Sequence, residues 1–301
     1  MPKIVVVGSS NTDMVVKTDR FPEPGETIIG GDFYMFPGGK GANQAVAAAR
    51  AGGEVIFICA VGDDVFGQNA LNGYASENIN MNSALVIKNE ASGVALITVN
   101  REGENEIVVA SGTNAKLSLD HLKSVLGDTN GDTVFLTQLE TPIETVAFLA
   151  EHTKASQQKL IINPAPAQAL DDHILQGLFL ITPNETEIKI LTGIAIENES
   201  SMKDAAKVLL AKGVDNVIIT LGSQGSFFMN ASENFRVPAP KVTAVDTTAA
   251  GDVFNGFLSV CIADNMNWQD SIAMASKAAA LSVTKMGAQD TAPTKEEINQ
   301  F

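Results

Sequence analysis

The sequence predicts an α/β fold in which a mainly parallel central sheet carries helices on both faces, a Rossmann-like three-layer arrangement, with a small antiparallel β lid added to it. Short apolar runs alternate along the chain with longer amphipathic stretches, which is typical of a parallel sheet covered by helices. Because the short runs are continuously apolar, they fit strands that are buried on both faces. The expected strands are Lys3–Gly8, Val55–Val61, Thr133–Leu139, Lys159–Asn163, Leu178–Thr182 and Val217–Leu221.

The stretches between these strands have the length and polarity pattern of helices. Pro142 and Pro183 stand where a helix or its approach begins, a position at which the missing N–H group is tolerated. The expected helices are Gly41–Ala51, Val65–Asn78, Pro142–Lys154, Glu185–Thr192, Lys203–Lys212 and Asp270–Thr284.

Two segments, 13–36 and 84–111, break this alternation. The first consists of extended pieces joined by a proline-rich stretch, and in the second Gly93–Asn100 and Glu106–Ser111 flank the turn Arg101–Asn105. Neither segment contains a helix that covers a second sheet face. We therefore expect an accessory sheet, or lid, that buries its uncovered face on a ligand, a partner subunit or both.

The chain has 301 residues, and no linker-like, repetitive or low-complexity tract interrupts it. We therefore expect one domain spanning residues 1–301, into which the lid is inserted. A chain of this size buries enough surface to fold without disulfides or structural metals. Cys59 and Cys261 lie in apolar runs and are expected to be reduced core residues.

The charge balance is strongly acidic, with 35 Asp and Glu residues against 20 Lys and Arg residues and a net charge of −15. This balance argues against general binding to nucleic acids or anionic membranes, since both need a basic surface. No apolar run approaches the roughly 18 residues of a membrane-spanning helix. The apolar run Ile4–Val7 is too short for a secretory signal, so we expect a cytoplasmic protein.

A glycine-rich cluster, Pro37–Gln44, leads into the first expected helix. Glycines let a ligand approach the backbone, and the free N–H groups of a helix start favour anions or hydroxyls. The cluster is not a Walker A loop, because Gly41 follows Lys40 where Ser or Thr is required. A tight turn is the simpler interpretation, but Lys40 and Asn43 add polar groups that such a turn does not need.

A second cluster, Asp246–Asp252, leads directly into the apolar run Val253–Ala263. Backbone N–H groups of residues 249–251 can converge at the positive start of that helix and form an anion hole. Asp252 would lie beside the anion and could take a proton from an attacking hydroxyl. An ordinary acidic residue near a helix N-terminus is the alternative.

Other polar residues follow expected strands. Asn184 and Glu187 share one helix face, which suits either Mg²⁺ bound through water or a helix N-cap. The turn Thr220–Gly225 either cradles a nucleotide phosphate or simply links two extended runs. Asn11 and Asp13 stand where the first strand ends, the usual ligand side of such a sheet, although an Asx-rich turn is the alternative. No G-x-G-x-x-G motif follows this strand, which disfavours a nicotinamide oxidoreductase.

Together these segments resemble the ribokinase branch of the PfkB sugar-kinase family over essentially the whole chain. Gly38–Asn43 is similar to the family's N-terminal signature, and Asp246–Asp252 is similar to its highly specific C-terminal signature. Gly8–Asp13, Gln138–Glu140 and Asn163–Ala167 are similar to the ribokinase branch in particular. The resemblance implies ATP-dependent phosphorylation of D-ribose at its 5-hydroxyl, which gives D-ribose 5-phosphate and ADP, with Mg²⁺ and an activating K⁺.

The resemblance also implies roles for individual residues. Asp252 would be the general base, and the anion hole would consist of Ala249, Ala250 and Gly251. The sugar hydroxyls would be held by Asn11, Asp13, Gly39, Lys40, Asn43, Glu140 and Asp252. The nucleotide would be held by Asn184, Thr220, Gly222, Ser223, Gly225, Gly251 and Ser276. Glu187 would organise Mg²⁺ through water, and K⁺ would be surrounded by Asp246, Thr248, Ser282, Lys285, Gly287 and Thr291.

The favoured interpretation is a D-ribose kinase that dimerises through its lid and has no nucleic-acid or membrane partner. A kinase for 2-deoxyribose or for a nucleoside is the alternative within the family, but the polar sugar-side residues suit a small polyol. We expect Asn11 to favour a sugar that keeps its 2-hydroxyl, because a site built for a hydroxyl penalises its absence. A non-catalytic sugar sensor is disfavoured by the intact Asp252 and anion hole.

Overall fold

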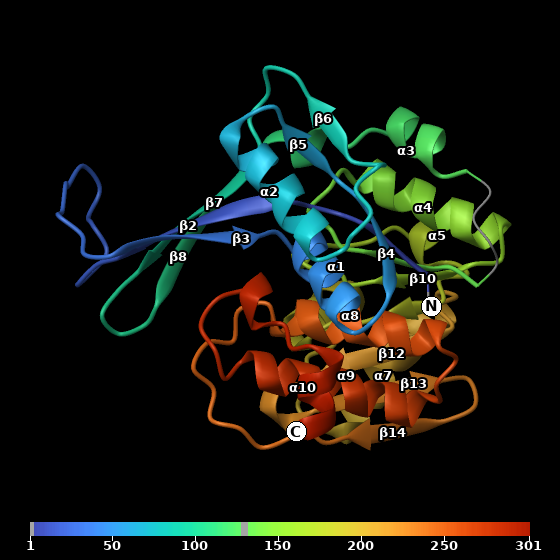
Figure 1. Cartoon of the computed structure of the whole chain (residues 1–301). Helices are drawn as coiled ribbons and strands as arrows, with labels where there is room; N and C mark the ends of the chain where they lie inside the picture. Colours follow the sequence, from blue (N-terminus) through green and yellow to red (C-terminus); the bar gives the residue numbers. More distant parts are fainter. Residues whose placement is uncertain (1–2, 128–131) are drawn as a thin grey trace.

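The computed structural model describes residues 3–127 and 132–301, and its body is built on one sheet of order β14-β13-β12-β11-β10-β9-β1-β4 (Figure 1). The strands from β12 to β4 run parallel, whereas β13 and β14 form an antiparallel edge that was not expected. The predicted fold class is confirmed. The strands are β1 (Lys3–Val7), β4 (Glu54–Ile58), β9 (Val134–Thr137), β10 (Lys159–Ile162), β11 (Leu180–Ile181), β12 (Asn216–Thr220), β13 (Ser226–Asn230) and β14 (Asn234–Val237).

Helices cover both faces of this sheet because its strands present apolar side chains on both sides. In β1, Ile4 and Val6 belong to one core and Val5 and Val7 to the other, and all four are buried. The first core is completed by α1 (Lys40–Arg50), α2 (Val65–Ser76), α8 (Ala250–Ala263), α9 (Trp268–Ser282) and α10 (Lys295–Gln300). The second core is completed by α3 (Leu119–Val125), α4 (Ile143–Ala155), α5 (Asp172–Leu175), α6 (Glu185–Thr192) and α7 (Glu199–Ala211).

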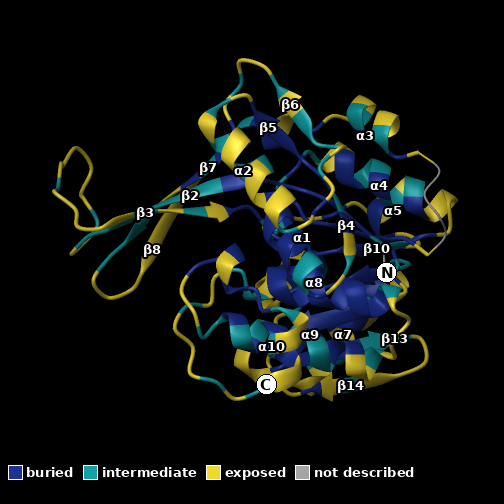
Figure 2. Cartoon of the chain, viewed as in Figure 1, coloured by how far each residue is buried: buried dark blue, intermediate teal, exposed yellow. Residues whose placement is uncertain are grey.

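A second sheet, the lid, extends away from the body (Figure 1), and its outer strand β8 is exposed along its whole length (Figure 2). The antiparallel pairs β2–β3 and β7–β8 are joined by a parallel pair, β2–β7. Within the described ranges, no helix has the length and apolar character needed to cross a membrane. The lid strands are β2 (Asn11–Lys17), β3 (Phe33–Gly38), β7 (Gly93–Val99) and β8 (Asn105–Ala110).

The segment 84–111 enters the lid only from Gly93, so the expected boundary at residue 84 is corrected. Its first part forms β6 (Leu85–Ile87), which pairs in parallel with β5 (Ala60–Gly62) outside the lid. The physical reason is burial, because Leu85 and Ile87 pack against the second core of the body.

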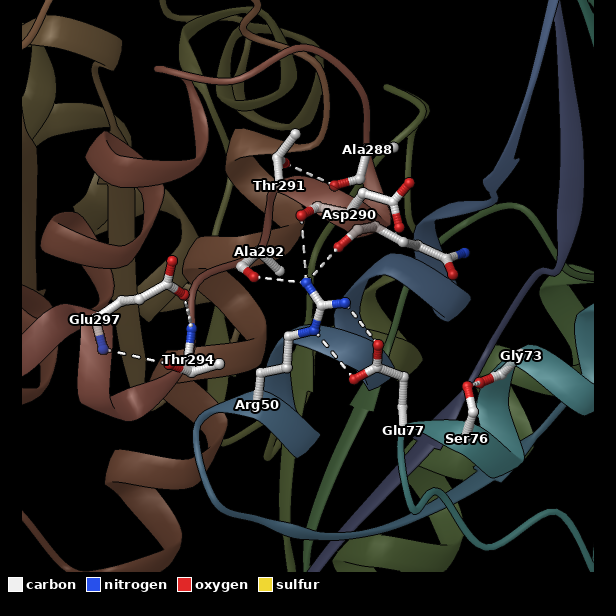
Figure 3. Close-up of polar contacts among 11 residues, drawn as sticks. Arg50, Gly73, Ser76, Glu77, Ala288, Asp290, Thr291, Ala292, Thr294 and Glu297 are labelled. Atoms are coloured by element: carbon white, nitrogen blue, oxygen red, sulfur yellow. Dashed lines mark hydrogen bonds and ion pairs between the residues drawn. The ribbon is translucent and has the colours of Figure 1, made fainter.

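Arg50, the last residue of α1, joins segments that are distant in the sequence (Figure 3). Its guanidinium group donates to both carboxylate oxygens of Glu77, at 3.0 Å from Nε and 2.6 Å from Nη2. Its Nη1 atom donates to the backbone carbonyls of Gln289 at 3.1 Å and Ala292 at 2.7 Å. The Arg50 side chain is 19% exposed, so these bonds fix the 289–292 segment in a place with little water.

Replacing Arg50 by Met should lower the free energy of unfolding by about 2 kcal/mol, because hydrogen bonds to a charged donor are lost. Urea denaturation measures the change. The matched control is Arg20→Met, which removes the ion pair between Arg20 and Glu26. The Arg20 side chain is 58% exposed, so this change should affect stability little. Equal effects in the two variants would contradict the role given to Arg50.

Candidate active site

The residues assigned to the sugar lie together where the lid joins the body. The carboxylate of Glu140, just beyond β9, accepts hydrogen bonds from Ser9 Oγ at 2.5 Å and from the backbone N–H of Lys40 at 3.1 Å. Gly39 precedes α1 with a φ of 90°, and a Cβ atom there would lie 2.7 Å from the backbone nitrogen of Asn11. Only glycine therefore allows the start of α1 to lie against the start of β2.

Asp252 lies in the first turn of α8, where it is 6% exposed. Its Oδ2 accepts a hydrogen bond from Asn43 Nδ2 at 2.9 Å, and its Oδ1 accepts one from Gln44 Nε2 at 2.9 Å. Burial raises the pKa of Asp252, while the charge of Lys40 and these two hydrogen bonds lower it. Each carboxylate oxygen keeps a lone pair, so the group can still accept a hydrogen bond from a hydroxyl.

Gln44 received no role from the sequence, yet it holds the carboxylate of Asp252 in place. Its Nε2 also donates to Asn163 Oδ1 at 3.1 Å, and its Oε1 accepts from Gln138 Nε2 at 2.5 Å. Gln138 and Asn163 stand within motifs that carry the family resemblance, and Gln44 directly follows the N-terminal signature, which was the available signal. Their contact depends on the fold, because Gln44 lies 94 positions from Gln138 and 119 from Asn163.

The ammonium group of Lys40 lies within electrostatic range of the carboxylates of the site. The pKa of Lys40 is raised, chiefly by Asp252 and further by Glu140, Glu187 and Asp13, although burial opposes the shift. Burial and the neighbouring charge of Glu140 raise the pKa of Asp13 to about 6. The structure thus brings the predicted sugar-side groups into one electrostatically coupled cluster.

A cavity of about 800 Å³ lies beside this cluster, between the end of β12 and the starts of α6 and α8. The loop 239–247 before α8 also lines it, and its Lys241 and Thr247 were not anticipated. Lys241 adds positive charge that favours a polyanion. The cavity is lined by all the residues assigned to the nucleotide, namely Asn184, Thr220, Gly222, Ser223, Gly225, Gly251 and Ser276.

The residues of the predicted anion hole lie at the start of α8, but their amides are not all free. Ala249 precedes the helix in the left-handed conformation, with a φ of 60°. The N–H group of Ala250 donates to the carbonyl of Thr247 at 3.3 Å. Ala250 would therefore have to leave this long bond before its N–H group could reach an anion.

The structure confirms the helix N-cap interpretation of Asn184 and Glu187. They form a capping box, in which Asn184 Oδ1 accepts from the Glu187 N–H at 2.8 Å and Glu187 Oε2 accepts from the Asn184 N–H at 2.8 Å. Glu187 is 6% exposed, and burial raises its pKa while the charge of Lys40 lowers it. A carboxylate with remaining lone pairs near the cavity fits Mg²⁺ bound through water.

The residues assigned to K⁺ come from two loops that the structure brings together. Asp246 accepts from the Gly287 N–H at 3.1 Å and from Thr248 Oγ1 at 2.7 Å. The hydroxyls of Ser282 and Thr291 donate to carbonyls of their own turns, at 2.9 Å and 2.7 Å. Their oxygen lone pairs thus stay available.

Lys285 can offer only its backbone carbonyl to a cation, because its ammonium group has no lone pair. The ammonium group pairs with Glu297 at 3.1 Å. In the described parts of the chain, no group of three His, Cys, Asp or Glu residues is placed to hold a metal ion. The oxygen atoms of these loops instead fit a large monovalent cation that relies on carbonyls and hydroxyls.

Comparison with known proteins gives matches along the whole chain. A model of the pfkB family of carbohydrate kinases matches residues 1–295. A ribokinase from Haemophilus influenzae is 41% identical over 298 residues, which are 99% of this chain and 97% of that protein. A deoxyribokinase from Salmonella typhi is 36% identical over 299 residues, 99% of this chain and 98% of that protein. The structure of an Arabidopsis thaliana ribokinase complexed with ribose and ATP superposes with a TM-score of 0.92 at 29% identity, covering 99% of this chain and 98% of that one.

These matches cover the lid as well as the body, and they confirm the resemblance carried by the two signature motifs. The chain therefore belongs to the pfkB family of carbohydrate kinases, enzymes that transfer a phosphoryl group to a sugar hydroxyl.

Proposed function

We propose that this enzyme transfers the γ-phosphoryl group of ATP to the 5-hydroxyl of D-ribose, giving D-ribose 5-phosphate and ADP. The observation that carries the proposal is the position of Asp252, whose carboxylate is hydrogen-bonded to the sugar-side residue Asn43 and which directly follows Gly251, a lining residue of the cavity. The identity of 41% to a ribokinase over almost its full length supports ribose as the acceptor. The Arabidopsis relative, which was solved with ribose and ATP, supports the same pair of substrates.

In this mechanism Asp252 orients the 5-hydroxyl and takes its proton as the oxygen attacks the γ-phosphorus. The bond between the γ-phosphorus and the bridging oxygen breaks, and ADP leaves. Hydrogen bonds from Asn43 and Gln44 hold the Asp252 carboxylate still and favour its ionised form. These amides are neutral, so they stabilise the charge of the base without competing for the proton.

The charge that develops on the phosphate needs positive partners. The amides at the start of α8 and the ammonium group of Lys241 supply them from the protein. The neighbourhood of Glu187 would hold Mg²⁺, which supplies charge neutralisation at the β- and γ-phosphates. The loops of Asp246 and Gly287 would hold K⁺, which would supply positive charge next to the loop that precedes α8.

A kinase for 2-deoxyribose is the second candidate, favoured by the identity of 36% to the Salmonella deoxyribokinase. The cluster of Asp13, Lys40 and Glu140 argues against a nucleoside, because it offers polar groups where a base would need apolar ones. A coupled assay of ADP formation with D-ribose, 2-deoxyribose, fructose and adenosine distinguishes these acceptors. The proposal requires the highest kcat/KM for D-ribose, and a higher value for another acceptor would replace it.

We further propose that one face of the lid covers the sugar and that the other face packs against the lid of a second subunit. The pairing of the strands places Met35, Leu96 and Val108 in one row, with exposed fractions of 48%, 51% and 66%. Asp13 stands in the neighbouring row, so its side chain lies on the opposite face. An exposed apolar face of this kind is an aggregation hazard that a symmetric homodimer would bury.

Replacing Asp252 by Asn should lower kcat by about 10²- to 10⁴-fold or more, because the general base is lost. ATP binding and the urea midpoint should stay near those of the wild type. The wild-type rate should fall at low pH as Asp252 is protonated, at a pKa above the ordinary value of 3.8, since burial raises it. The control is Asp264→Asn at the far end of α8, and a near-normal kcat in Asp252→Asn would contradict the assignment.

Potassium should raise the rate well above the rate in sodium or tetramethylammonium, because the oxygen atoms around Asp246 and Gly287 suit a large monovalent ion. The measurement is the initial rate at saturating ribose and MgATP with each chloride salt at equal ionic strength. Asp246→Asn should weaken the response to K⁺, since it removes the charge of the site. Equal rates with and without K⁺ would refute the site.

Sedimentation velocity at micromolar concentration should show a dimer for the wild type and a monomer for Leu96→Asp, because a charge on the apolar face opposes lid packing. The matched control is Val65→Asp on α2, where Val65 is 64% exposed, and it should leave the dimer intact.

Closure of the lid on ribose should slow proteolysis of the Arg101–Asn105 turn. A monomeric wild type would end the dimer proposal, and proteolysis unchanged by ribose would end the closure proposal.

A further inference from the structure

Asn114 is buried at the root of the lid, and its side chain contacts the strand that carries the sugar-side residues. It belongs to the short helix η1 (Gly112–Lys116), which directly follows β8, and it is 2% exposed. Its Oδ1 accepts a hydrogen bond from the Ser10 N–H at 2.9 Å. Its Nδ2 donates to the Ser10 carbonyl at 3.1 Å and to Asn11 Oδ1 at 2.7 Å.

The backbone of Ser10 fixes which way the Asn114 amide points, since an N–H group can only donate and a carbonyl can only accept. Nδ2 is therefore the atom of Asn114 that faces Asn11, and the Asn11 atom that meets it must be Oδ1. Asn11 Nδ2 is left as a donor that has no hydrogen-bond partner in the described ranges. Asn11 and Asp13 stand two residues apart in β2, so both side chains lie on the same face of the lid.

Gly93 provides the space for this pair of amides. It lies opposite Asn11 in the β2–β7 pairing. A Cβ atom at Gly93 would lie 2.2 Å from Asn11 Oδ1 and 2.2 Å from Asn114 Nδ2, which no side chain tolerates. The contact between the two amides therefore depends on glycine, which has no side chain, at the first residue of β7.

A donor at Asn11 complements the other groups around the sugar. The carboxylates of Asp13, Glu140 and Asp252 only accept hydrogen bonds when ionised. Asn43 uses its Nδ2 on Asp252, and its Oδ1 is buried without a partner in the described parts of the chain. Because each sugar hydroxyl has one proton, a hydroxyl that donates to these acceptors needs a separate donor to satisfy its oxygen.

We propose that Asn114 is a positioning residue that makes Asn11 a hydrogen-bond donor toward a sugar oxygen and thereby sets the preference for ribose over 2-deoxyribose. The inference rests on the proposed function, since it takes ribose as the acceptor. Asn114 acts through Asn11 and does not itself contact the sugar.

The first test is Asn114→Ala, with kinetics for both pentoses and with ribose binding measured by calorimetry in the absence of ATP. We expect kcat/KM for ribose to fall about tenfold, the size of one well-placed hydrogen bond, with kcat and the KM for ATP unchanged. The value for 2-deoxyribose should change less than about twofold, because the proposal has Asn11 donate to the 2-oxygen, which this sugar lacks. An equal loss for both sugars would show a merely structural role and overturn the proposal.

A double-mutant cycle tests the route through Asn11. In the Asn11→Ala background, adding Asn114→Ala should leave the ribose to 2-deoxyribose preference unchanged. Additive losses of preference in the double variant would overturn the proposal. If Asn114→Ala does not fold, Asn114→Asp replaces it, because this variant keeps the bond to the Ser10 N–H and removes the donation to Asn11. A wild-type preference in Asn114→Asp would equally overturn the proposal.

Asn11→Asp tests the direction of the hydrogen bond. The aspartate is isosteric and still accepts from Asn114, but it cannot donate to the sugar. We expect it to lose ribose affinity at least as much as Asn11→Ala, and wild-type affinity would overturn the donor assignment. Failure of the proposed function looks different, because the wild type would then neither bind nor phosphorylate ribose, and the inference would fall with it.

Discussion

Four carboxylates, those of Asp13, Glu140, Glu187 and Asp252, lie within electrostatic range of the ammonium group of Lys40, and the site depends on how this surplus of negative charge is stabilised. Crowded carboxylates raise one another's pKa and tend to take up protons unless fixed donors favour the charged form. Three of the four have such donors. Amides of Asn43 and Gln44 donate to Asp252, Ser9 and the Lys40 backbone donate to Glu140, and Asn184 donates to Glu187.

Asp13 is the exception, because no donor to its carboxylate lies in the described ranges and its pKa is raised to about 6. The hydroxyls of a neutral sugar can supply the missing hydrogen bonds, whereas a polyphosphate brought to this cluster would meet four like charges. The groups that suit a sugar and the groups that suit a polyphosphate are therefore separate. The cavity that suits the polyphosphate is lined by the start of α8 and by Lys241, which offer positive charge.

Helix α1 connects this cluster to the rest of the protein. Its first turns carry Lys40, Asn43 and Gln44, and its last residue, Arg50, holds the 289–292 segment. Two bonds connect this part of the chain to the site. Gln289 Nε2 donates to the Gly38 carbonyl at 3.3 Å, and the nearby Gly287 N–H donates to Asp246 at 3.1 Å. Residues 287–292 therefore link the glycine cluster to the loop before α8, although about 200 residues separate these two segments in the sequence.

The sequence was sufficient to predict the layered body, the lid and the two glycine clusters, because these follow from local patterns of apolar residues and turns. It did not reveal Gln44, Arg50 or Asn114, whose partners lie 27 to 242 positions away and are chosen by packing. The boundary of the lid at residue 84 was misplaced for a similar reason. A short extended run pairs with whichever strand buries its apolar side chains, and for Leu85 and Ile87 that strand is β5 in the body.

The lid strands carry residues of the proposed sugar site, so the proposed function links the position of the lid to sugar binding. Strand β2 carries Asn11 and Asp13, and β7 begins at Gly93 beside Asn11. A Cβ atom at Gly38, the last residue of β3, would lie 2.3 Å from the Asp13 carboxylate, so this strand also packs on Asp13. If Asn11 and Asp13 hold the sugar, as we propose, a lid movement would displace them, and a bound sugar would favour one lid position over the others. Under the proposed function, an empty sugar site leaves the lid without this constraint and Asp252 without a hydroxyl to deprotonate, which limits transfer of phosphate to water.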